Sequence, residues 1–444
     1  MDCIKKNTHS KPLIMNSKYH ILLIAVVFIL FTNCKEEMAT QITNVNDYDS
    51  YLNVSDNEAL ERAKQNELFW SQKLKQTPNQ FPYKGKLATT YSNYFSATGQ
   101  VEYLKKAEDY LLEVNEITRY NNASYLKSLA YNYISQHKFK EALTALTKAE
   151  LIGEDLQDTR KMLFDVYLEL GNYEMAHTYL NTFENFSDFD YLIRLSKWSD
   201  HKGDLESAIK YMEKALAIAE ASNLSPLKQW SYTNIADFYG HAGDIKKSYE
   251  YYLKALALDP NDAYAKKGIA WIVYSYEDNP KEALRILNAV TDTFFAPDYF
   301  LLKAEIAEYM GNENMVEEQL ALYKDAMQNK AYGDMYNKYN VLLQAETNPE
   351  QAMSIAKTEV ENRPTPQSYD LLAWTYFNNG NLDEALQIVD QHIIDKTFEP
   401  ETLYHVAEIY KAAGKGEALV PLKKELLAST YELGPTMEAK ILKL

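Results

Sequence analysis

A segment that recurs about every 32 to 40 residues is the feature that most constrains the fold of this 444-residue chain. In the clearest copy, residues 229–262, two apolar runs flank Gly243, and each run has the 3.6-residue period of one helix face. The large residues of these runs are Tyr232, Ile235, Tyr239, Ile245 and Tyr252. A glycine between two helical runs predicts a tight turn between two antiparallel helices, and Pro260 is expected to end the second helix.

The same pattern extends from residue 84 to residue 416. Most copies carry a glycine at the turn between their two helices, at Gly99, Gly171, Gly203, Gly311, Gly380 and Gly414. Three copies have other residues there, namely His137, Asn279-Pro280 and Asn348-Pro349. The sequence therefore predicts about ten helix pairs in one array.

The spacing, the small residues Ala236 and Ser248 where paired helices meet, and the period near 34 resemble the tetratricopeptide repeat, or TPR. This resemblance implies an all-α fold, a right-handed α-α superhelix of the TPR solenoid type, without separate domains. Repeat arrays need atypical ends. We expect residues 55–83 to form an N-terminal capping helix, starting with Ser55 and Glu58 at the spacing of a capping box, and residues 417–444 to form C-terminal capping helices.

Composition agrees with a helical array and excludes some other classes. The chain has only 14 glycines and 13 prolines, which disfavours turn-rich all-β folds. Its formal net charge is −17, whereas nucleic-acid binding requires a basic surface. We therefore expect a protein or peptide partner and no nucleic acid.

The amino terminus has the pattern of a secretory signal. Residues 21–31 form an unbroken apolar run that follows Lys18 and is too short to span a membrane. The run leads into Leu30-Phe31-Thr32-Asn33-Cys34, which resembles the lipobox of bacterial lipoproteins. The resemblance implies a signal peptide over residues 1–33 and lipidation of Cys34. Whether Met1 or Met15 is the start stays open, and the alternative for the apolar run is a buried core segment beside an incidental cysteine.

The residues that follow Cys34 bear on the compartment. Lys35-Glu36-Glu37 resembles a surface-export signal of some Gram-negative lipoproteins. We expect an outer-membrane lipoprotein in the cell envelope of a Gram-negative bacterium, with surface exposure as a further hypothesis. Residues 34–54 are polar and lack periodicity, so they are interpreted as a flexible tether.

Catalytic motifs are missing from the sequence. It contains no phosphate-binding loop, dinucleotide fingerprint, zinc motif or nucleophile elbow. His405 and Glu408 have the spacing of two ligands on one helix face, but without a further ligand motif they are interpreted as surface residues. We therefore predict a non-enzymatic protein that uses neither a cofactor nor a metal.

The TPR resemblance also implies a binding surface, because the first helix of each unit lines the concave face. Counting back from the turn of each unit, we assign a set of mostly aromatic groove-binding residues: Trp230, Asp237, Tyr264, Trp271, Tyr274, Trp374, Phe377 and Tyr404. The same count also selects Thr233, Asn234, His241, Lys267, Leu301, Glu305, Glu308, Asp370, His405 and Glu408. Exposed aromatic side chains are typical binding anchors, although the alternative is that they pack between repeats.

Three functions remain open at this point. The first is a lipid-anchored adaptor or scaffold that binds a peptide or partner protein in the concave groove. The alternative is a glycan- or nutrient-binding surface lipoprotein that partners an outer-membrane transporter, with sugars stacked on aromatics. The third is a structural component of envelope or secretion machinery. A TPR fold by itself warrants only binding.

Overall fold

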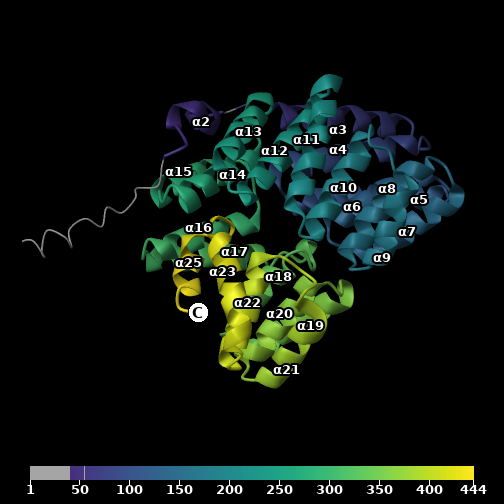
Figure 1. The fold of residues 1–444 in the computed structure, drawn as a ribbon. Helices are drawn as coiled ribbons and strands as arrows, with labels where there is room; N and C mark the ends of the chain where they lie inside the picture. The colour runs from purple at the N-terminus through teal and green to yellow at the C-terminus, as the bar shows by residue number, and fades with distance from the viewer. Residues whose placement is uncertain (1–40, 55) are drawn as a thin grey trace, which may run out of the picture. The chain divides into compact units, whose positions relative to one another are not determined.

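The structure is a computed structural model that describes residues 41–54 and 56–444. The proposed signal peptide, Cys34 and Ser55 lie outside the described residues. Residues 42–444 form one compact unit, and its described elements are all helices (Figure 1). Among the described residues, no helix is long and apolar enough to cross a bilayer.

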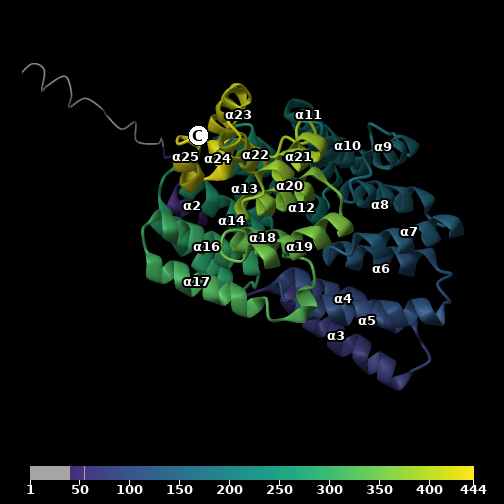
Figure 2. The same ribbon diagram turned by 90° about the horizontal axis from the view of Figure 1, so that it is seen from below.

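Ten antiparallel helix pairs succeed one another along the chain, which confirms the predicted all-α repeat superhelix (Figures 1 and 2). The first five pairs are α4 (Pro82–Thr98) with α5 (Val101–Ile117), α6 (Ala123–Ser135) with α7 (Phe139–Ile152), α8 (Leu156–Glu169) with α9 (Tyr173–Thr182), α10 (Phe189–His201) with α11 (Leu205–Ser222), and α12 (Ser225–His241) with α13 (Ile245–Leu258). The last five are α14 (Ala263–Trp271) and the π-helical turn η1 (Ile272–Tyr276) with α15 (Pro280–Thr291), α16 (Pro297–Tyr309) with α17 (Glu313–Ala326), α18 (Asn337–Gln344) with α19 (Pro349–Asn362), α20 (Pro366–Asn378) with α21 (Leu382–Ile388) and the π-helical turn η3 (Val389–Ile393), and α22 (Pro400–Ala412) with α23 (Gly416–Ala428).

The turns inside the pairs have the left-handed backbone that the glycines predicted. Gly243 has a φ of 77° and Gly203 a φ of 75°. In two of the three units without a turn glycine, His137 and Asp278 take the same conformation, with φ of 57° and 53°. The left-handed turn is therefore kept in these two units although its usual residue is replaced.

Small residues let the paired helices approach closely, as the repeat pattern predicted. Ala236 and Ser248 are fully buried. In the next unit, Gly268 lies under the ring of Tyr252, so close that an added Cβ would lie 2.2 Å from the ring carbon Cζ. The apolar cores of neighbouring units share residues such as Tyr167, so one core runs from repeat to repeat.

The array is long enough to return on itself. Three turn glycines of early units lie against backbone or side chains of late units, pairing Gly99 with Phe295, Gly171 with Pro364 and Gly203 with Phe398. The Phe295 N–H donates to the Thr98 carbonyl oxygen at 2.8 Å. Arg363 pairs with Glu169, 194 residues earlier. One superhelical turn therefore takes about 194 residues, and the late units stack on the early ones.

The N-terminal helix of the array differs in detail from its prediction. Helix α3 (Glu58–Gln76) packs against α4. Its N-cap is Asn57, whose side chain accepts from the Leu60 N–H at 2.9 Å, so the expected capping box of Ser55 and Glu58 is wrong. The Asn57 side chain thereby satisfies one of the free N–H groups in the first turn of α3.

The expectation of a tether through residue 54 is wrong for its described part. Helix α2 (Val45–Leu52) packs on α13 and α15, and its Tyr48 is 1% exposed. The Tyr48 hydroxyl donates to Glu282 at 2.7 Å. Glu277 accepts the backbone N–H groups of Ile42 and Thr43, both at 2.6 Å. The buried Tyr48 and the Glu277 carboxylate therefore hold this segment against the array, although its sequence lacks a periodic apolar pattern.

The C-terminal end also differs, because α23 completes the tenth pair instead of capping the array. The closing elements are α24 (Thr430–Leu433) and α25 (Pro435–Ile441), which contact α12, η1 and α16. The Tyr431 carbonyl oxygen accepts from the Trp271 indole at 3.0 Å and from the Ser275 hydroxyl at 2.7 Å. The C-terminal segment therefore covers part of the face that the register assigned to the groove.

Candidate functional site

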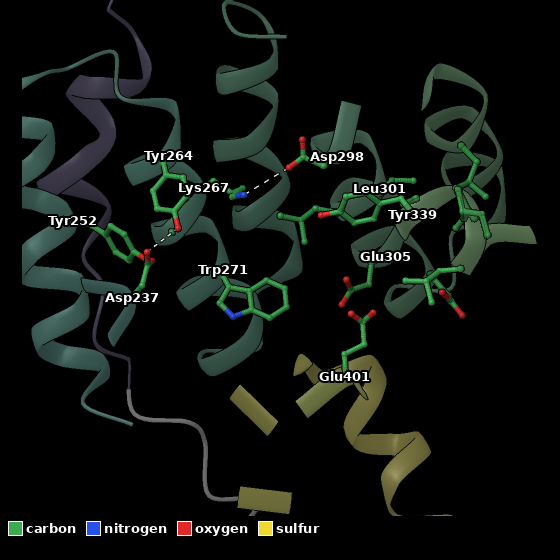
Figure 3. Close-up of a pocket in the computed structure, with 18 residues that line it drawn as sticks. Asp237, Tyr252, Tyr264, Lys267, Trp271, Asp298, Leu301, Glu305, Tyr339 and Glu401 are labelled. Carbon is green, nitrogen blue, oxygen red and sulfur yellow. Dashed lines mark hydrogen bonds and ion pairs between the residues drawn. The ribbon is translucent and has the colours of Figure 1, made fainter. Parts of the chain in front are cut away.

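A pocket of about 600 Å³ opens between the first helices of several consecutive units (Figure 3). We call it the groove. Its side chains come mainly from α14, α16, α17 and α18, with single residues from α12, α13 and α22: Asp237, Tyr252, Tyr264, Lys267, Gly268, Trp271, Asp298, Leu301, Leu302, Ala304, Glu305, Glu308, Val316, Leu320, Tyr339, Leu342, Leu343 and Glu401. Small-molecule and cofactor sites commonly have volumes of roughly 300–1,000 Å³.

Apolar side chains make up a large part of the groove. They come from three neighbouring helices: Leu301, Leu302 and Ala304 on α16, Val316 and Leu320 on α17, and Leu342 and Leu343 on α18. Leu301 is half-buried and belongs to none of the apolar core clusters among the described residues. A ligand side chain placed here would remove apolar surface from water, which is favourable by roughly 25 cal/mol per Å².

At one end of the groove, Asp237 is held by two tyrosines (Figure 3). The Tyr264 hydroxyl donates to Asp237 at 2.7 Å, and the Tyr252 hydroxyl donates to its other oxygen. Burial raises the pKa of Asp237, and the two tyrosine hydrogen bonds oppose that shift. Asp237 is therefore fixed in position, with both carboxylate oxygens already engaged.

Toward the other end, Glu305 and Glu401 point toward one another (Figure 3). The Tyr274 hydroxyl donates to Glu305 at 3.3 Å. Burial raises the pKa of Glu305 to about 7, with contributions from Glu308 and Glu401, while the Tyr274 hydrogen bond and Lys440 act in the opposite direction. Near neutral pH, Glu305 therefore exchanges readily between its neutral and charged forms.

The groove contains three of the eight residues assigned from sequence, namely Asp237, Tyr264 and Trp271. Tyr274 is a wrong assignment, since it is 0% exposed. Its ring packs between Trp271 and Tyr309, and its hydroxyl lies 3.0 Å from that of Thr436 on α25. The C-terminal segment, which no repeat pattern indicates, buries it.

Trp230 lies outside the groove, on the part of the array nearer to α10. It is 41% exposed, and its ring meets the edge of Phe189 at 6.0 Å. It is not among the groove-lining residues of the described chain.

The remaining three assigned residues do not line the groove: Trp374 and Tyr404 lie beside a buried His405, and Phe377 packs on Trp374. His405 Nδ1 lies 2.8 Å from Asp370 Oδ2, and its ring stacks on Trp374 at 4.2 Å. Tyr404 is itself buried. These aromatics therefore pack between units, as the alternative interpretation held.

The interpretation of His405 as a surface residue is wrong, since it is 5% exposed. Burial alone would lower the pKa of His405, but the Asp370 carboxylate outweighs burial and the pKa is raised. Glu408 does not join this pair, because it accepts a hydrogen bond from Tyr404 at 3.0 Å. Among the described residues, no group of three or more potential metal ligands occurs.

Several groove residues were missed by the sequence reasoning, chiefly those of α17 and α18. The register assigned no residue of the α18 unit. Counting back from Asn348 places Tyr339 nine residues and Leu342 six residues earlier, which are two of the positions used for other units. That signal was available, whereas Val316 and Leu320 lie on α17, the second helix of its unit, which the register does not count.

Comparison with known families decides the nature of the repeats. A family model described as the tetratricopeptide repeat matches residues 190–222 and 231–262. The chain contains tetratricopeptide repeats. The two matches cover α10 with α11 and α12 with α13, which are consecutive helix pairs. Repeats of this family form protein-interaction scaffolds with extended concave surfaces.

The solved structures that this chain resembles share little sequence with it. It is similar to a human IFIT1 dimer with PPP-AAAA, at 13% identity and a TM-score of 0.46, over 72% of this chain and 75% of that one. It is also similar to yeast Tom70, at 14% identity and a TM-score of 0.35, over 90% and 93% of the two chains. PilF of Pseudomonas aeruginosa has 15% identity and a TM-score of 0.36, over 48% and 96%. A search of curated proteins found no match.

Proposed function

We propose that this TPR protein is a non-enzymatic, lipid-anchored adaptor of the outer membrane that holds a peptide segment of a partner protein in the groove. The observation that supports the site is the groove itself, an open, largely apolar pocket of about 600 Å³ between repeat helices. The TPR scaffold supports a protein partner. The amino-terminal signal pattern supports the anchor.

The first test replaces one side chain of the apolar part of the groove. Leu301→Gln is expected to weaken partner capture about tenfold, because it places a polar amide where an apolar anchor would be buried. Capture is measured by chemical crosslinking and co-purification from native membranes. The matched control is Leu322→Gln, since Leu322 lies on α17, is 42% exposed and does not line the groove.

Tryptophan variants would be less informative at this site. Trp271 donates to the C-terminal segment and Trp374 stacks on His405, so alanine at either position would also disturb packing. If Leu301→Gln and Leu322→Gln recovered the same partner in equal amounts, the groove would not be its binding site.

The second test concerns the anchor. Cys34→Ser is expected to move most of the protein from the membrane fraction to the soluble fraction, because acyl chains on Cys34 would supply the attachment. Fractionation with immunoblotting and labelling with an alkyne fatty acid measure this. Cys3→Ser is the control, since Cys3 precedes the proposed cleavage point and should change neither readout. Membrane retention of the Cys34→Ser protein would contradict the anchor.

A further inference from the structure

Acidic side chains outnumber basic ones in the lining of the groove. Five carboxylates line it, from Asp237, Asp298, Glu305, Glu308 and Glu401, against the single lysine Lys267. The other lining residues are mainly leucine, valine and aromatic side chains. Such a pocket favours a ligand that combines an apolar body with positive charge.

Two of these carboxylates already have cations beside them. Lys267 Nζ lies 3.7 Å from Asp298, and Lys338 Nζ lies 2.5 Å from Glu401. For the other three, no lysine or arginine of the described chain comes within 4.0 Å of the carboxylate. Asp237 is engaged by its two tyrosines, which leaves Glu305 and Glu308 on α16 as the carboxylates best placed to meet an incoming cation.

We propose that the groove selects a cationic peptide segment, with a lysine or arginine side chain against Glu305 and Glu308 and an apolar side chain on the leucines of α16 and α18. This inference rests on the proposed function, that the groove holds a peptide. In an extended peptide, residues two apart project to the same side at about 6.6–6.8 Å spacing. An apolar residue and a basic residue two positions apart can therefore engage the leucines and the acids from the same side of the peptide.

The chain's own C-terminal segment shows that this region accepts peptide backbone. The Tyr431 carbonyl oxygen accepts a hydrogen bond from the Trp271 indole N–H. A Cβ added at Gly434 would lie 3.0 Å from Glu305 Oε1, so the backbone of this segment runs close to Glu305. Lys440 on α25 is close enough to act on the charge of Glu305. At the edge of the groove, the C-terminal segment thus already offers a backbone carbonyl to Trp271 and a basic residue, Lys440, to Glu305.

Because of the groups around Glu305, the affinity of the groove for a cationic peptide is expected to depend on pH. Glu305 faces Tyr274 of η1, Glu308 of α16, Glu401 of α22 and Lys440 of α25. Because the pKa of Glu305 is raised to about 7, a cationic ligand either binds protein in which Glu305 is already ionised or causes Glu305 to lose its proton on binding. Because apparent affinity scales with the fraction of the binding-competent form, binding is expected to weaken up to about tenfold between pH 8 and pH 6.

Three capped octapeptides test the proposal with the purified mature chain. Each places leucine and a second residue, which is lysine, glutamine or glutamate, two positions apart in turn along the chain, with serine at the positions between them. Fluorescence anisotropy is expected to show the lysine peptide binding about tenfold or more tightly than the glutamate peptide. Glu305→Gln should weaken the lysine peptide about tenfold, remove most of its pH dependence and leave the glutamine peptide unchanged.

The control is Glu361→Gln, an exposed glutamate of α19 that does not line the groove. It changes the net charge by the same amount and should change no affinity. If all three peptides bound with equal affinity, the cationic preference would be overturned. If Leu301→Gln weakened the binding of each of them, the groove would still be a peptide site. Peptide binding that Leu301→Gln leaves unchanged would overturn both this inference and the proposed function.

Discussion

Gly99→Ala is expected to lower the free energy of unfolding by about 3 kcal/mol or more, and to disrupt the contact between successive superhelical turns. Gly99 has a φ of 70°, and its added Cβ would lie 2.2 Å from the carbonyl oxygen of Phe295. Neither side can yield easily, because the Phe295 N–H is bonded to the Thr98 carbonyl oxygen next to the glycine. The strain therefore falls on the backbone of both units.

Gly243→Ala is the matched control for this experiment. Gly243 occupies the same turn position, with a φ of 77°, but nothing lies within 4 Å of its added Cβ. It should cost only about 1 kcal/mol, the penalty for a left-handed alanine. Urea unfolding of both variants measures the difference, which isolates the contact between the two turns. Equal losses would show that this contact contributes nothing to stability.

His405→Ala is expected to have the second large effect, a loss of about 3–5 kcal/mol in unfolding free energy. The substitution leaves Asp370, which is 3% exposed, with only the Thr402 hydroxyl as a hydrogen-bond donor to its Oδ2 atom, at 3.3 Å. The Oδ1 atom of Asp370 already has no hydrogen-bond partner among the described residues. A buried carboxylate left in this state is costly, and the lost ring also leaves a cavity beside Trp374.

The effect of His405→Ala should depend on pH with a defined sign. Because the folded-state pKa of His405 is raised by Asp370, its stabilisation is full below the unfolded value of about 6.5. It is lost as pH rises through the folded-state pKa. The stability gap between wild type and His405→Ala should therefore narrow as pH rises above 6.5, as measured by urea unfolding across a pH series.

His177→Ala is the control for the histidine experiment. His177 also stacks on a tryptophan, Trp198, at 5.1 Å, but it is exposed, and none of the ion pairs among the described residues includes it. Its replacement should cost no more than about 0.5 kcal/mol at any of these pH values. A loss as large as that of His405→Ala would mean that stacking, and not the pair with Asp370, is responsible.

Features of the fold that depend on a few consecutive residues could be predicted from the sequence. The turn at Gly243, the helices on both sides of it and the close packing at Ala236 follow from local periodicity and from the left-handed turn. Those rules act within one unit, so ten copies of the pattern were enough to give ten helix pairs. The same register found Asp237, Tyr264 and Trp271 in the groove.

The sequence by itself thus determined the repeat, its helix pairs and part of the groove, and the tertiary structure decided the rest. The contact of Gly99 with Phe295 depends on small rotations accumulated over about 194 residues, which no single repeat records. The docking of Tyr48, the burial of Tyr274 beneath the C-terminal segment and the pairing of His405 with Asp370 likewise join residues with no shared local pattern. Local preferences fix the units, whereas long-range packing decides which of their side chains remain open to a partner.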